Sequence, residues 1–313
     1  MQDVTKLDIG KTAFAGFGVI GRQPLAVLIW VVFFAIVGLL PTLGLLGAVA
    51  TSVSNIVAAS KGGAEPTPEM IMPMVASILA MIPVLMITGL VLRVVLTGAI
   101  FRAVLFPADK SWFYLRLGAR ELWLGLLFIV VGVITAALAM LMMAIVVPLT
   151  LVGASQDDPM MKLMLIRAAM LPVYVIMAFL FVRFCLAFPM TFAESKFRLI
   201  ESWKMTSGNS WRIVLVGVIL IALAIAMEMV VAVLVLAFVF GLIGAGAMHG
   251  GWTEEHMTAF FSQAPAVWMH ALAPWFVGGA LVISLFATLV MVVFTAPWAE
   301  AYRQLGSPAD PAH

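Results

Sequence analysis

The stretch "ESKFRLIESWKMTSGNSWRIVLVG", residues 194–217, decides the fold, because it is the most polar run in a chain that is otherwise almost entirely apolar. A short charged helix is expected to stop at residues 206–209, where a long apolar helix then begins. Of the 313 residues, 64% are hydrophobic and only 10% are charged. A soluble domain of this length cannot bury that much apolar surface, so the solvent must be lipid. The sequence predicts an all-α integral membrane protein in which this stretch connects two spans.

Apolar runs long enough to cross a bilayer occur six times, since a crossing needs about 20 residues. They cover about residues 25–49, 71–101, 122–152, 160–192, 213–243 and 267–298. We expect a single membrane domain over residues 1–303 and a disordered tail over residues 304–313. The single cysteine, Cys185, excludes an intrachain disulfide.

Lysine and arginine residues are distributed unevenly between the two sides of the expected membrane. One side collects Lys6, Lys11, Arg22, Arg93, Arg102, Lys110, Arg116, Arg120, Arg183, Lys196, Arg198, Lys204, Arg212 and Arg303. The other side has Lys61, Lys162 and Arg167, which makes the ratio 14 to 3. Cytoplasmic loops carry the excess of positive charge. We therefore expect a multi-pass protein of the bacterial inner (plasma) membrane with both termini in the cytoplasm, and no cleaved signal peptide.

The six spans pair as three in–out–in hairpins with weak internal similarity. The segments before the hairpins read "AFAGFGVIGRQPLAVLIW", "WFYLRLGARELWLGLL" and "ESWKMTSGNSWRIVLVG", and those after them read "TGAIFRA", "FPMTFAE" and "TAPWAEA". If these are repeats, they share one orientation, and a pseudo-symmetry axis would run along the membrane normal. The alternative is a chance alignment of apolar, alanine-rich sequence.

The polar stretch predicts an interfacial amphipathic helix over residues 194–205. Phe197, Ile200 and Trp203 recur at helical spacing on one face, which leaves Ser202 on the exposed face. Glu194 and Arg198 are four residues apart and form a supporting pair. One interpretation is a plain connecting elbow that sets tilt and depth. The alternative is a binding site for anionic lipid headgroups. The candidate residues for that site are Lys196, Arg198, Lys204, Arg212, Trp203 and Trp211.

A second candidate site consists of charges inside the spans. Glu228 lies fifteen residues from either end of the run 213–243, near the middle of the bilayer. A carboxylate at that depth is costly unless it is protonated, paired or hydrated. Arg93, Arg183 and Arg167 also lie within apolar runs, and we expect Arg93 or Arg183 to pair with Glu228. Such a pair is either purely structural or part of a substrate or proton site.

No catalytic signature stands out, so we expect no enzyme, cofactor or metal centre. A serine elbow, a zinc-protease motif and a phosphate-binding lysine loop are all missing from the sequence. His249 and His256, beside Glu254 and Glu255, form a loose pattern that lacks the fixed geometry of a zinc site. We interpret that segment as a solvated loop.

Two short motifs carry a resemblance to a known group of proteins. The first is the "SWKMTSGNSWR" element before a span, and the second is the closing "APWAEAYRQL". The residues that carry them are Ser202, Trp203, Gly208, Asn209, Trp211, Ala299, Tyr302 and Arg303. The chain resembles bacterial six-span proteins that are similar to the membrane domain of some glycerophosphoryl diester phosphodiesterases. Because no hydrolase domain follows the last span, the resemblance implies a membrane module without its enzyme.

These observations lead to two functional hypotheses. The first is a non-catalytic, permease-like module that binds or moves a lipid or small amphiphile. The alternative is a structural or accessory subunit of a larger membrane complex. The expected partners are membrane lipids and either another membrane protein or a second copy of the chain. The net charge of +2 gives no reason to expect nucleic acid as a partner.

The predicted topology can be tested with single cysteines in a Cys185→Ala background. Cysteines placed at Ser60 and Asp157 should react with an impermeant thiol reagent added from the periplasm, whereas one at Ser195 should not. The reverse labelling pattern would overturn the orientation.

Overall fold

The computed structural model describes residues 6–61, 67–154, 158–248, 253, 255, 259–260 and 263–306. Within these residues the secondary structure is helical, with short turns between the helices. His249 and His256, which we singled out as a loose metal pattern, lie outside the described residues.

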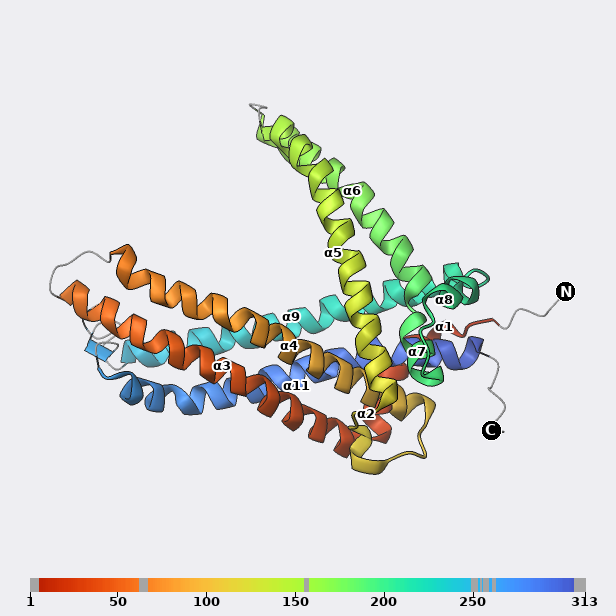
Figure 1. Ribbon diagram of the computed structural model, residues 1–313, viewed down its shortest axis with the longest axis horizontal. Coiled ribbons are helices and arrows are strands. Elements are labelled where there is room, and N and C mark those ends of the chain that lie inside the picture. Colours follow the sequence, from red (N-terminus) through yellow and green to blue (C-terminus); the bar gives the residue numbers. More distant parts are fainter. Residues whose placement is uncertain are drawn as a thin grey trace. The chain divides into compact units, whose positions relative to one another are not determined.

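Six long helices make up most of the described chain (Figure 1). They are α3 (Pro24–Lys61), α4 (Pro68–Leu105), α5 (Ala119–Ala154), α6 (Pro159–Phe184), α9 (Ser210–Met248) and α11 (Pro265–Leu305). The described residues contain six helices that are long and apolar enough to cross a membrane, which confirms the predicted all-α membrane class and the number of spans. The pairing of the spans into three hairpins and the internal repeat stay predictions.

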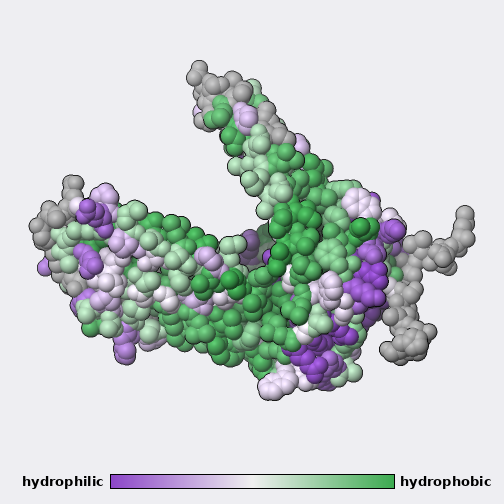
Figure 2. Space-filling model, viewed as in Figure 1, coloured by the Kyte–Doolittle hydropathy of each residue, from purple (hydrophilic) through white to green (hydrophobic). Residues whose placement is uncertain are grey.

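The long helices carry exposed apolar side chains along their length. Met86 on α4, Val133 on α5 and Ile283 on α11 are 71%, 64% and 67% exposed. A helix that is hydrophobic on all sides needs an apolar solvent. Figure 2 shows this hydrophobic cover along the helices and hydrophilic residues gathered at helix ends. The exposed apolar surface is therefore the surface that lipid would cover.

The chain divides into two compact units, and residues 20–96 and 221–292 form one of them. It contains α3, the first part of α4 and most of α9 and α11. A Cβ added to Gly44 of α3 would lie 3.6 Å from the Met81 side chain of α4, and one added to Gly47 would lie 4.0 Å from Met269 of α11. Helix α3 thus packs against both α4 and α11. We call this part the bundle unit.

Residues 1–19, 97–220 and 293–313 form the other compact unit, which we call the polar unit. It contains α5, α6 and the ends of α4, α9 and α11. Short helices also belong to it: α1 (Ile9–Ala13), η1 (Ser111–Tyr114), α7 (Ala187–Glu194) and α8 (Leu199–Thr206). Helix α2 (Ala15–Arg22) crosses the boundary between the units. Helix α5 contacts α6 and α7, and α8 contacts the same two helices.

The first and last described residues lie together in the polar unit. The Asp8 amide donates to the Gln304 side chain at 2.8 Å, and the Gln304 amide group donates to Thr12 at 3.2 Å. The Leu7 amide donates to Asn209 Oδ1 at 3.3 Å, which ties the N-terminal segment to the start of α9 as well. We call these residues the terminal clasp. The segment around residues 7–12 therefore lies beside the end of α11.

The clasp also corrects the predicted tail. We expected disorder from residue 304, but α11 continues to Leu305, and Gln304 bonds both Asp8 and Thr12. The carboxamide of Gln304 accepts a hydrogen bond through its oxygen and donates one through its nitrogen. One side chain can therefore bond both Asp8 and Thr12 and hold the end of α11 in place. Residues 307–313 lie outside the described residues.

The amphipathic helix predicted over residues 194–205 is wrong in its extent. Ser195 adopts a left-handed conformation with φ 53°, which ends α7 at Glu194, and α8 begins only at Leu199. The Arg198 amide donates to Thr191 Oγ1 at 3.2 Å and so bonds back onto α7. Phe197 therefore lies in the turn between two helices, off the helical face that we predicted.

The exposed and buried faces of α8 also differ from the prediction. Ile200 is 73% exposed, whereas Ser202 is fully buried. The Ser202 hydroxyl donates to the carbonyl oxygen of Arg183 at 2.8 Å, at the end of α6. Helix α8 docks on α6 through this small polar residue, because the hydroxyl satisfies a carbonyl that the helix end leaves without a partner.

Substitutions at these two positions of α8 should differ in their effect on stability. Ser202→Val removes the hydrogen bond to a buried carbonyl and should destabilise the fold by about 1–3 kcal/mol. Ile200→Ser changes an exposed side chain and should cost about 0.5 kcal/mol or less. Thermal unfolding of the purified protein in detergent measures both. An equal loss for the two variants would contradict the docking of α8 on α6.

Candidate functional site

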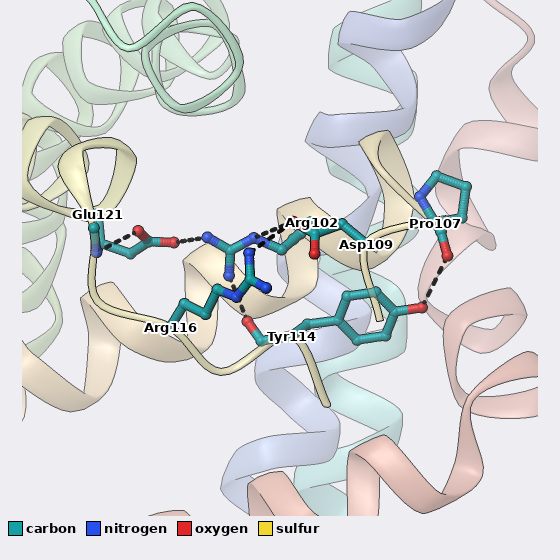
Figure 3. Close-up of polar contacts among 7 residues, drawn as sticks. Arg102, Pro107, Asp109, Tyr114, Arg116 and Glu121 are labelled. Atoms are coloured by element: carbon teal, nitrogen blue, oxygen red, sulfur yellow. Dashed lines mark hydrogen bonds and ion pairs between the residues drawn. The ribbon is translucent and has the colours of Figure 1, made fainter. Parts of the chain in front are cut away.

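A buried ion pair joins the end of α4 to the start of α5. Arg102 is 3% exposed and Glu121 is 1% exposed, and the Arg102 Nη2 group donates to Glu121 Oε1. Backbone groups bond the pair as well. Arg102 Nη1 donates to the Tyr114 carbonyl at 2.6 Å, and Glu121 Oε2 accepts from the Gly118 amide at 2.9 Å (Figure 3). The two charges therefore hold the connection between two spans.

Neighbouring residues pack closely around the pair of Arg102 and Glu121. A Cβ at Gly98 would stand 3.1 Å from two atoms of Glu121 and 3.4 Å from the Phe192 ring, so a larger residue there would crowd the carboxylate. The Arg102 guanidinium lies over the Phe192 ring, with 5.5 Å from Cζ to the centroid. Asp109 adds a second carboxylate, 3.8 Å from Arg102 and 3.2 Å from the exposed Arg116.

The loop between α4 and α5 is held in an uncommon conformation. Trp112, Phe113 and Tyr114 all have positive φ values, of 53°, 53° and 67°. Residues other than glycine rarely adopt this backbone region. Each residue that does so lowers the stability of the fold by about 1–3 kcal/mol. Tyr114 is 1% exposed, and its hydroxyl donates to the Pro107 carbonyl at 3.3 Å. Burial of Tyr114 and the bond from Arg102 hold the loop in this conformation.

A second network of charges covers the turn between α7 and α8. Arg198 bonds Glu194 at 2.7 Å and Glu201 at 2.8 Å, and Tyr302 donates to Glu194 at 3.3 Å. The predicted pair between Glu194 and Arg198 is confirmed. The hydrogen bond from Arg198 lowers the pKa of Glu201 below its ordinary value of 4.5. The stability that this bond adds is therefore present above that value and is lost as the pH falls through the lowered pKa.

The six predicted headgroup residues separate into different roles. Arg198 is occupied by two carboxylates, and Arg212 donates to the Leu7 carbonyl at 2.6 Å. Lys196, Lys204 and Trp211 are exposed. The remaining member of the set, Trp203, is 38% exposed and packs against α6.

Arg183 and Trp203, which we assigned to separate sites, lie together. The Arg183 Cζ atom lies 5.1 Å from the Trp203 ring centroid and 5.4 Å from that of Phe179. The Phe179 and Trp203 rings pack edge to face at 5.5 Å. Arg183 lies within the candidate span Pro159–Glu194, as we expected, but α6 itself ends at Phe184, so Arg183 lies in the last turn of that helix. This places a cation at a helix C-terminus, where the helix dipole favours it.

The other predicted members of the buried-charge site are exposed along the long helices. Glu228 lies on α9 and Arg93 on α4, and Arg167 lies on α6. Glu228 takes part in none of the ion pairs that the described residues form. The structure thus does not bring Glu228 together with an arginine in an ion pair, and a role for this residue stays a prediction.

Sequence reasoning missed the pair of Arg102 and Glu121. Arg102 entered only the charge count, and Glu121 was not singled out. One local signal was available, because Glu121 stands three residues after Gly118 at the start of a span. A glutamate at that position commonly bonds back to the first amide of its helix, as it does here. Its partner could not be read from the sequence, since a nineteen-residue separation has no helical period.

Comparison with known proteins adds no relative. No family of known proteins matches this chain, and neither a curated protein nor a solved structure matches it. Among the described residues no group of three or more His, Cys, Asp or Glu side chains could hold a metal ion. What the polar unit offers chemically is a set of cations and aromatic rings suited to binding an anion.

Removing the charge of Glu121 should destabilise the polar unit strongly. Glu121→Gln leaves the buried Arg102 with only the more distant Asp109 carboxylate, 3.8 Å from its Nε. Breaking a buried pair in this way should cost about 3–5 kcal/mol. The matched control is Arg116→Gln, which breaks an exposed pair with Asp109 and should cost about 0–1 kcal/mol. The readout is the thermal unfolding midpoint in detergent.

A double variant completes this test. Arg102→Met combined with Glu121→Gln removes the stranded charge and should recover part of the stability lost in the single variant. Additive losses in the double variant would show that the two side chains act independently.

Proposed function

We propose that this chain is a non-catalytic membrane module that binds or moves a lipid or another small amphiphile. The contacts with lipid headgroups would lie on the polar unit, at the cytoplasmic face of a bacterial inner membrane. The resemblance to the membrane domain of glycerophosphoryl diester phosphodiesterases stays a prediction that agrees with this role.

The observation that carries the proposal is the mixed surface of α8 and its neighbours. Ile200 and Trp211 are 73% and 71% exposed, so large apolar side chains point away from the protein. Lys196 and Lys204 are exposed close to them in sequence, and neither takes part in an ion pair of the described residues. Apolar groups that enter the headgroup region beside unpaired cations are typical of an element that lies on an anionic membrane surface.

Neutralising the two lysines should weaken the retention of anionic lipid. Lys196→Gln combined with Lys204→Gln should cost about 1 kcal/mol for each charge. Native mass spectrometry of protein reconstituted with phosphatidylglycerol and phosphatidylcholine measures retention of both lipids. The matched control is Arg198→Gln, because Glu194 and Glu201 already occupy that guanidinium. Unchanged retention of phosphatidylglycerol in the lysine variant would contradict the proposal.

A second candidate function is that of an accessory subunit in a membrane complex. Glu228 favours it, because an exposed carboxylate within an apolar span is costly when it faces lipid and is relieved by a polar group on another helix. The same native spectra separate the two functions. A bound protein or second copy that is lost in Glu228→Leu, with lipid retention unchanged, would favour the accessory role.

A further inference from the structure

The side chain of Arg183 has no acceptor within the described protein. Its Nε and Nη1 atoms are shielded from solvent and make no hydrogen bond, although the residue as a whole is only partly buried. Its remaining contacts are the faces of Phe179 and Trp203. Guanidinium groups carry five donors, and a buried donor without a partner costs free energy.

The carboxylates of α7 and α8 bind other partners and form no ion pair with Arg183. Glu194 binds Arg198 and Tyr302, and Glu201 binds Arg198. Arg183 forms no ion pair among the described residues, in contrast to Arg102 and Arg198. The end of α6 therefore carries a positive charge that belongs to none of the ion pairs of the described residues.

The aromatic contacts stabilise the cation without satisfying its donors. A ring face attracts a guanidinium group, and the effect grows when water is removed. The same contacts fix the plane of the guanidinium, because the rings of Phe179 and Trp203 pack against each other as well. A guanidinium held in this way loses little conformational freedom when an oxyanion binds to it.

We propose that Arg183, held against the rings of Phe179 and Trp203, binds the phosphate group of an anionic ligand. Arginine is the residue best suited to phosphate, since its donors match the oxyanion geometry. The exposed Ile200 on α8 and Trp211 at the start of α9 would place the acyl chains of a phospholipid beside this site. The assignment of the phosphate to a lipid rests on the proposed function; free phosphate is the other source of the same chemistry.

The first experiment uses the unaltered full-length chain in detergent. Arg183 is only partly buried as a residue, so an arginine-specific reagent such as phenylglyoxal should still reach its guanidinium group. Peptide mass spectrometry then gives the rate of modification at each arginine. Short-chain phosphatidylglycerol should slow the modification of Arg183 about tenfold, whereas phosphatidylcholine should have a smaller effect. Arg116, which is exposed and paired with Asp109, is the internal control and should react equally in all samples.

An arm with inorganic phosphate alone separates the two sources. Protection by phosphatidylglycerol but not by inorganic phosphate identifies a lipid-borne phosphate, and protection by both identifies a site for phosphate in general. Protection by neither would overturn the proposal. Because no residue is changed, this result does not depend on whether a variant folds.

Variants give the second measurement. Arg183→Gln should weaken binding of phosphatidylglycerol about tenfold with an unchanged thermal midpoint, and Arg183→Lys should restore part of it because the charge returns without the planar donor set. Equal binding by the unaltered chain and Arg183→Gln would overturn the proposal.

If the variant of Lys196 and Lys204 loses lipid while Arg183 is unprotected, the proposed function stands and this site falls. If inorganic phosphate protects Arg183 while no anionic lipid is retained, the site stands and the lipid function falls.

Discussion

The ion pair of Arg102 and Glu121 is the contact on which the arrangement of the polar unit depends. It binds the end of α4, the start of α5 and the carbonyl of Tyr114 in one buried network. Two charges removed from water must satisfy each other, and Arg102 Nη1 and Glu121 Oε2 also bond backbone groups, so the pair tolerates little displacement. The left-handed loop at Trp112–Tyr114 presents the Tyr114 carbonyl to Arg102, which donates a hydrogen bond to it.

The long helices contribute less to specificity than this network does. Lipid is as apolar as leucine, so the exposed apolar side chains of α3 to α6 gain little by choosing one neighbour over another. Polar contacts are different, because an unsatisfied buried polar group is costly. Ser202, Asn209 and Gln304 each bond a residue that is distant in the sequence. Such polar side chains determine how the helix ends of the polar unit fit together and how residues 7–8 attach to them.

Arginine residues of the polar unit illustrate how the same charge acquires different roles. Arg102 is neutralised inside the protein, and Arg198 is neutralised at its surface by two glutamates. Arg183 has aromatic rings where the others have carboxylates. A guanidinium with its own counter-ion is a structural group, whereas one that lacks an acceptor is suited to an external anion. The role of each arginine therefore follows from the groups that it contacts, since the side chain itself is the same in all three.

The amino-acid sequence by itself determined the membrane class, the number of spans and their approximate positions, because hydrophobicity and length act locally along the chain. It also identified the pair of Glu194 and Arg198, whose spacing of four is local as well. Only the tertiary structure decided that Ser202 is buried and Ile200 exposed, that Glu121 meets Arg102, and that Arg183 meets Trp203. Those contacts join different helices, and a sequence pattern records the period of one helix but not the neighbour that it packs against.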